Sequence, residues 1–315
     1  MSNTKINVRK IKGYDIKPPK KGAFQIPTDD DFPKLHTLSI FSGRRGSGKS
    51  VGVANLVKMG KQKGYIDKCW LVSPTYWSNK EIWDIADING PDDQCGDKFK
   101  NKEEHECEVY EPIVGVLRMI IKKVDEERVA WENHLMMLKR YKQYKKDLKK
   151  PLEDCDPEDV ADYDEFGFLD HNGPPKWKYD HEGPGRCAVI IDDCVGTDLM
   201  SKPSAGLLNF CIKHRHIGKG TGISIFMLVQ TYACLGGVPR AIRENATHLF
   251  LYKLKDETQL EKIHKEIGCD LDLDKFDEIF AFATVDQYAF LSIDFTIKND
   301  EEHKRFRKNF NEYLT

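Results

Sequence analysis

Residues 43–50 constrain the fold more than any other part of the chain, because they complete the pattern G-x-x-x-x-G-K-[ST]. In order they are Gly43, Arg44, Arg45, Gly46, Ser47, Gly48, Lys49 and Ser50. An apolar run at 38–41 precedes them and a helix-like stretch at 51–59 follows, so the order is strand, loop and helix. In that context the amides of the loop and the N-terminus of the helix bind phosphate groups. The alternative is an ordinary turn rich in glycine and serine. The flanking elements favour a phosphate loop.

Two side chains of this loop have predicted roles of their own. Lys49 is placed to reach the β- and γ-phosphates of a nucleotide, and the hydroxyl of Ser50 is placed to bind Mg²⁺. The predicted cofactors are therefore ATP and Mg²⁺.

A pair of carboxylates provides the second half of the predicted site. Asp192 and Asp193 follow the apolar run 187–191, which is typical of a buried strand. A carboxylate at the end of such a strand can bind Mg²⁺, so Asp192 is the predicted metal ligand. Asp193 is then placed to act as the general base that activates water. The alternative is a strand that ends in a polar turn, where Asp-Asp pairs are common.

Three further polar residues are candidates for sensing or stabilising the phosphate. Gln230 ends the apolar run 222–229 and is predicted to lie beside the γ-phosphate, although it is also suited to capping nearby backbone. Arg215 is the candidate arginine finger, supplied to a neighbouring subunit of a ring. A plain arginine near a helix C-terminus is the alternative for Arg215. Arg243 is the second candidate for the finger, or a helix-surface arginine.

Composition limits the cellular compartment and the fold classes that are open to the chain. The chain has 315 residues, a net charge of −2, and nine cysteines without a C-x-x-C pair, which favours reduced thiols in a cytosol-like compartment. No apolar run approaches the roughly 18 residues that span a bilayer, so we expect a soluble protein without a membrane span. The predicted fold is a three-layer α/β domain of the P-loop NTPase type (ASCE or RecA-like) with a mostly parallel central sheet.

Charge and turn residues divide the chain into three predicted parts. Residues 1–34 carry many lysines and form a basic N-terminal arm, which is either a solvated terminus or a contact to DNA or another subunit. Residues 35–315 form the ATPase domain, interrupted by an insertion at 109–186. The insertion begins with an amphipathic helix predicted at 112–150, whose basic last part contains interleaved tyrosines. That part is suited to a phosphate backbone or is simply a solvated face.

These elements together resemble the FtsK–HerA superfamily of P-loop motor ATPases, and most closely the poxvirus-type DNA-packaging ATPases of large DNA viruses and virophages. The resemblance rests on the phosphate loop, Ser73-Pro74-Thr75, Asp192-Asp193, the segment from His214 to Gln230, and the segment from Pro239 to Asn245. It implies a homo-oligomeric ring that uses ATP to move double-stranded DNA of any sequence into a preformed capsid. It further implies a capsid or portal partner, and a location in the host cytoplasm or in the virion.

Two other functions compete with a DNA translocase. A nucleotide or small-molecule kinase would transfer the phosphate to an acceptor, although no acceptor motif stands out. A non-catalytic scaffold would bind ATP only to order an assembly, with the long helix as its partner surface. A GTPase is disfavoured because no Asn-Lys-x-Asp motif follows the phosphate loop.

Overall fold

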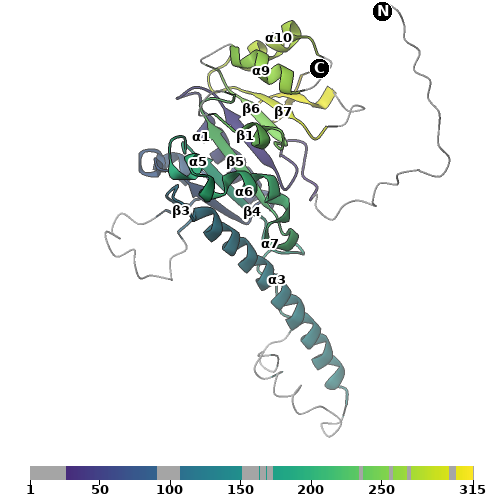
Figure 1. The fold of residues 1–315 in the computed structure, drawn as a ribbon. Coiled ribbons are helices and arrows are strands. Elements are labelled where there is room, and N and C mark those ends of the chain that lie inside the picture. Colours follow the sequence, from purple (N-terminus) through teal and green to yellow (C-terminus); the bar gives the residue numbers. More distant parts are fainter. Residues whose placement is uncertain are drawn as a thin grey trace, which may run out of the picture.

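The computed structural model describes residues 26–90, 107–150, 163, 168, 173–233, 237–254, 258–267, 271–297 and 303–314. Its centre is a nine-stranded sheet in the order β3-β2-β4-β5-β1-β6-β7-β8-β9 (Figure 1). The strands are β1 Leu38–Ser42, β2 Lys68–Val72, β3 Val109–Tyr110, β4 Cys187–Asp192, β5 Ile223–Val229, β6 His248–Leu251, β7 Leu291–Asp294, β8 Phe306–Lys308 and β9 Glu312–Tyr313. Neighbours run parallel from β3 to β6, and antiparallel from β6 to β9.

The central strands are buried on both faces, as their continuous apolar sequences predict. Alternate residues of one strand join different cores, because successive side chains point to opposite faces of a sheet. In β1, Leu38 and Ile40 belong to one hydrophobic cluster and Phe41 to the other. In β5, Ile225 and Met227 belong to the first cluster, while Phe226 and Leu228 belong to the second.

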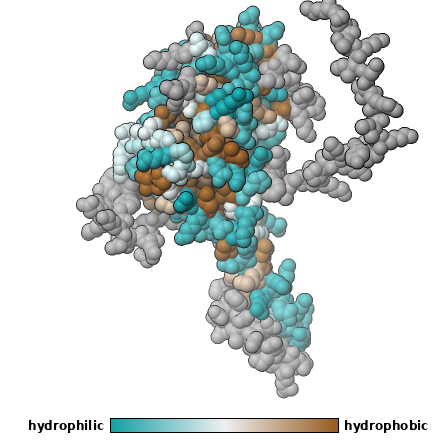
Figure 2. Space-filling model, viewed as in Figure 1, coloured by the Kyte–Doolittle hydropathy of each residue, from teal (hydrophilic) through white to brown (hydrophobic). Residues whose placement is uncertain are grey.

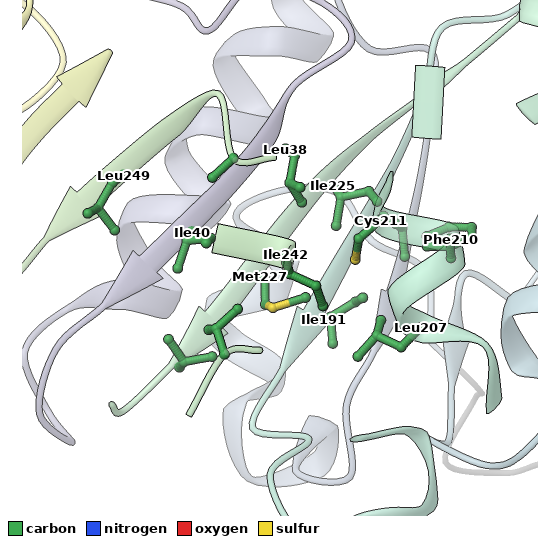
Figure 3. Close-up of a cluster of buried hydrophobic side chains, with 14 of the residues drawn as sticks. Leu38, Ile40, Ile191, Leu207, Phe210, Cys211, Ile225, Met227, Ile242 and Leu249 are labelled. Carbon is green, nitrogen blue, oxygen red and sulfur yellow. The ribbon is translucent and has the colours of Figure 1, made fainter. Parts of the chain in front are cut away.

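Helices cover both faces of the sheet. The α-helices are α1 Lys49–Gln62, α2 Lys80–Asp84, α3 Val116–Asp147, α5 Asp198–Ser201, α6 Leu207–Lys213, α7 Ile217–Gly220, α8 Arg240–Arg243, α9 Thr258–Ile267 and α10 Leu273–Ala283. Short 3-10 turns are η1 Tyr76–Asn79, η4 Pro203–Ala205 and η5 His214–His216. Helices α1 and α2 pack on the face of Phe41. Helices α6 and α8 pack on the face of Ile40 (Figure 3), as does the start of α3. The three layers and the mostly parallel sheet confirm the predicted fold class.

The long helix α3 has two parts with different surroundings. Its first turns belong to the core, where Val116, Leu117, Ile120 and Val124 are buried. Its last part projects away from the body of the molecule (Figure 1). The helix begins at Val116 rather than at the predicted residue 112, after Gly115 with φ 102°. The start of the predicted insertion 109–186 therefore lies within the core, since β3 also pairs with β2.

The predicted N-terminal arm lies mainly outside the described residues. Of its last part, Phe32 is buried against the α1 side of the sheet. Asp29 and Asp31 form ion pairs with Lys63 at 2.9 and 2.8 Å. Residues just before 35 therefore pack on the α/β fold, although the division of the chain at 34 remains a prediction.

Two stretches differ from the sequence expectations. The sequence at 204–219 is helix-like, but the structure breaks it into η4, α6, η5 and α7, and Gly218 and Lys219 have left-handed backbones with φ 61° and 54°. Residues after 295 are rich in charged side chains and would suggest a tail, but they include β8 and β9, which extend the sheet. Phe306 of β8 is buried, and this single apolar side chain was too weak a signal to predict a strand.

Candidate active site

A cavity of about 700 Å³ opens at the edge of the sheet where the parallel strands end. Ligands of open α/β sheets bind at this edge. Its polar, glycine and aromatic lining comes from five segments: Arg45, Gly46, Ser47, Gly48, Lys49, Ser50, Thr75, Ser78, Asn79, Asp192, Asp193, Gln230 and Tyr288. The phosphate loop, both carboxylates and Gln230, which are far apart in the sequence, thus share one cavity.

The phosphate loop joins β1 directly to α1 and requires glycine at two positions. Gly43 lies so close to Tyr252 that an added Cβ would be 2.5 Å from the tyrosine Cβ. Gly48 has φ 96° and immediately precedes α1. A left-handed backbone at this point is available to glycine without a steric cost. The first amides of α1 have no acceptor within the helix, so this end is suited to an anion.

Lys49 lies inside the loop that precedes it. Its Nζ donates hydrogen bonds to the carbonyl oxygens of Gly43 at 2.7 Å and of Arg44 at 3.0 Å. Burial lowers the pKa of Lys49, and the charges of Asp192 and Asp193 act in the opposite direction. The ammonium group is therefore partly removed from water and close to both carboxylates.

The two carboxylates have different environments. Asp192 ends β4 and is 5% exposed, whereas Asp193 is exposed and has a left-handed backbone with φ 50°. Burial, together with the charge of Asp193, raises the pKa of Asp192 to about 7, while Lys49 acts to lower it. A cation bound at Asp192 would offset this cost of burying the charge.

Ser50 and Asp192 fit a magnesium ion. Mg²⁺ in phosphate-binding sites is usually held by one or two carboxylates together with phosphate oxygens and water. Among the residues that the structure describes, no three or more His, Cys, Asp or Glu side chains form a group that could hold a metal ion. The hydroxyl of Ser50 and the carboxylate of Asp192 both line the cavity, so a metal–triphosphate complex suits them better than a free ion.

Gln230 lies beside the predicted base. Strand β5 lies between β1 and β4, so its end comes between the phosphate loop and the carboxylates. The Nε2 of Gln230 donates to Oδ1 of Asp193 at 3.3 Å. A side chain in this position can contact both Asp193 and a ligand on the loop.

Four polar or aromatic lining residues, Thr75, Ser78, Asn79 and Tyr288, had no role assigned from the sequence. Thr75, Ser78 and Asn79 follow β2, and Asn79 Nδ2 donates to Thr75 Oγ1 at 3.4 Å. The polar run after a predicted parallel strand was the available signal for these three. Tyr288 comes from the loop before β7, and nothing in the local sequence relates it to a phosphate loop 240 positions earlier.

The two candidate finger arginines lie away from the cavity of their own chain. Arg215 is exposed in η5, and the neighbouring His214 lies 3.2 Å from the carbonyl oxygen of His36, just before β1 begins. Arg215 is therefore at the opposite edge of the sheet from the phosphate loop. Arg243 makes a two-pronged ion pair with Glu266, at 2.9 and 2.7 Å, so its guanidinium is already engaged.

No helix among the described residues is long and apolar enough to cross a membrane. No protein-family model and no curated protein sequence matches this chain.

Several solved structures resemble the chain at low sequence identity. One is the genome packaging NTPase B204 from Sulfolobus turreted icosahedral virus 2 in complex with ATP-gammaS, with 12% identity, 88% of this chain and 98% of that chain covered, and a TM-score of 0.40. Another is the pCW3 conjugation coupling protein TcpA, with 16% identity, coverage of 85% and 59%, and a TM-score of 0.39. A third is the cytoplasmic domain of the type VII secretion ATPase EccC of Thermomonospora curvata, with 13% identity, coverage of 88% and 25%, and a TM-score of 0.37. At these scores the likeness adds nothing to what the chain's own strand order shows.

Proposed function

We propose that this chain is an ATP-hydrolysing motor of the FtsK–HerA type that moves double-stranded DNA and thereby packages a viral genome. The observation that carries the hydrolase part is the meeting of Lys49, Ser50, Asp192, Asp193 and Gln230 at one cavity. A phosphate loop alone binds nucleotides. Two carboxylates in the same cavity would add a metal ligand and a base for water.

The proposed reaction uses these side chains in sequence. The triphosphate binds along the loop, and its oxygens replace the two carbonyl oxygens that Lys49 now contacts. A magnesium ion at Ser50 and Asp192 would supply Lewis-acid stabilisation of the phosphate charge. Asp193 takes a proton from water, and the water oxygen attacks the γ-phosphorus as the bond to the β-phosphate oxygen breaks. Gln230 orients Asp193 and the water.

Release of free phosphate distinguishes hydrolysis from the two competing functions. Purified protein with Mg²⁺ and ATP should produce inorganic phosphate without any added acceptor. Phosphate found on an added nucleoside or small molecule would support a kinase instead. Tight ATP binding without turnover, with or without DNA, would support a scaffold.

An arginine finger from Arg215 would require a ring. The chain brings its loop, carboxylates and Gln230 together, while Arg215 lies at the far edge of the sheet, so an arginine finger from Arg215 must come from a second copy. We therefore expect Arg215→Ala and Lys49→Ala to be inactive separately and partly active when mixed. In mixed rings, an Arg215→Ala subunit binds ATP and receives Arg215 from a Lys49→Ala neighbour. Steady-state phosphate release from mixtures measures this.

A matched mixture controls for non-specific rescue. Lys49 and Asp193 act in the same cavity, so mixing Lys49→Ala with Asp193→Asn should restore no activity. If the Arg215→Ala and Lys49→Ala mixture also stays inactive although both variants assemble, Arg215 is not a finger that acts between subunits.

The DNA contact is supported by the projecting end of α3. Lys139, Lys142 and Lys146 are exposed and recur at three- and four-residue spacing, so they lie on one face of the helix. Most of the described side chains visible at this end are hydrophilic in the space-filling view (Figure 2). A row of lysines on a projecting helix suits the phosphate backbone of DNA of any sequence.

Reversing these three charges should weaken DNA binding without changing the basal rate of ATP hydrolysis. In the variant Lys139→Glu, Lys142→Glu, Lys146→Glu, we expect the slope of log affinity against log salt to fall by about three. Fluorescence anisotropy with duplex DNA at several salt concentrations measures the slope. The control replaces Lys122, Lys202 and Lys275 with glutamate, which changes the net charge equally. An unchanged slope in the α3 variant would exclude this face as the DNA contact.

A further inference from the structure

We propose that Tyr288 is the platform on which the nucleotide base stacks, an inference that rests on the proposed ATP-binding site. Tyr288 lines the same cavity as the phosphate loop. Its side chain is 59% exposed, so a large aromatic surface beside the cavity is open to solvent. A base has a flat aromatic face, and stacking on tyrosine would remove both surfaces from water.

The strand order determines which end of the triphosphate faces Tyr288. Asp192 and Asp193 follow β4, which is separated from β1 by β5. Tyr288 precedes β7, which is separated from β1 by β6 on the other side. The phosphate loop follows β1 and therefore lies between the carboxylates and Tyr288. Since the γ-phosphate must lie at the carboxylates, the nucleoside must point towards Tyr288.

Tyr288 is at the correct edge of the sheet because β7 runs antiparallel. Leu291, the first residue of β7, pairs with Leu251, the last residue of β6. The start of β7 therefore lies where the parallel strands end, which is the edge that carries the phosphate loop. A parallel strand in this place would have put the same residue at the opposite edge.

The backbone at both sides of the contact is constrained. Tyr288 has φ 68°, a left-handed conformation that is uncommon for a bulky side chain. Its ring lies against Gly48, where an added Cβ would be 3.0 Å from the tyrosine Cβ and 3.1 Å from Cδ1. Uncommon backbone conformations of this kind cluster at ligand sites. The ring is thus positioned beside the first turn of α1, within reach of a nucleoside that extends from the loop.

Binding of ATP and of tripolyphosphate, each with Mg²⁺, separates the base from the phosphates. We expect Tyr288→Ala to raise the dissociation constant for ATP about ten-fold and to leave that for tripolyphosphate unchanged. Tyr288→Phe should bind ATP like the wild type, because the ring is retained. In Tyr288→Ala, the affinity for GTP should fall as much as the affinity for ATP, since stacking tolerates either base. The control is Phe282→Ala, which removes an aromatic side chain of similar exposure (58%) from α10 without touching the cavity.

Two results would overturn the assignment. An unchanged ATP affinity in Tyr288→Ala would show that the ring does not contact the base. An equal loss for ATP and tripolyphosphate would show that the ring acts through the shape of the loop at Gly48. Failure of the proposed ATP-binding site is distinct, because then the wild type would bind neither ligand. Failure of the proposed hydrolysis alone would leave both affinities unchanged and would show as absent phosphate release.

Discussion

Replacing Lys49 with alanine is expected to abolish measurable ATP binding, and turnover with it. The ammonium group occupies the loop with two hydrogen bonds, and in the complex these would go to phosphate oxygens. Hydrogen bonds to charged groups contribute about 1.5–3 kcal/mol each, so losing two predicts at least a 100-fold weaker affinity. The loss should be larger still, because one positive charge fewer would offset the repulsion between the triphosphate and Asp192 and Asp193. Isothermal titration with a slowly hydrolysed ATP analogue measures this.

The matched control for Lys49 lies on the same helix. Lys58 is an exposed lysine of α1 that does not line the cavity, so Lys58→Ala should bind ATP like the wild type. An affinity of Lys49→Ala within a few-fold of the wild type would refute the phosphate-loop assignment.

Replacing Asp193 with asparagine is expected to separate binding from chemistry. The substitution keeps the size of the side chain but removes the proton acceptor for water, which predicts a fall in turnover of about 10²- to 10⁴-fold. ATP affinity should be retained or improved, because one negative charge leaves the cavity that receives the triphosphate. The two readouts are phosphate release at saturating ATP and the dissociation constant of ATP.

A nearby carboxylate controls for a simple change of charge. Asp198 starts α5, forms a surface ion pair with Lys202 at 2.8 Å and does not line the cavity, so Asp198→Asn should turn over ATP normally. If Asp193→Asn hydrolysed ATP at close to the wild-type rate, Asp193 would not be the base.

The parts of the site that could be predicted from sequence are those with local patterns. The phosphate loop has a fixed spacing and lies between a strand and a helix, and Asp192 directly follows five apolar residues. Each signal spans fewer than a dozen residues. The parallel sheet then brings them together, because the ends of parallel strands share one edge.

The parts that could not be predicted depend on strand order and on single backbone conformations. Tyr288 reaches the cavity only because β7 pairs antiparallel with β6, which no local pattern near residue 288 indicates. The helix-like sequence at 204–219 is broken into short segments, and the left-handed φ of 54° at Lys219 is not indicated by its residue type. Arg215 lies in the turn that leads into β5, at the far edge of the sheet. Its distance from the cavity could therefore be known only from the fold.

The most direct test of the account is the rate of phosphate release from ATP with and without long double-stranded DNA at low salt. A DNA-coupled motor predicts a several-fold higher rate with DNA, lost in Lys49→Ala and suppressed as salt increases. A rate that is the same with and without DNA would contradict the coupling, and would leave an ATPase that acts on something else.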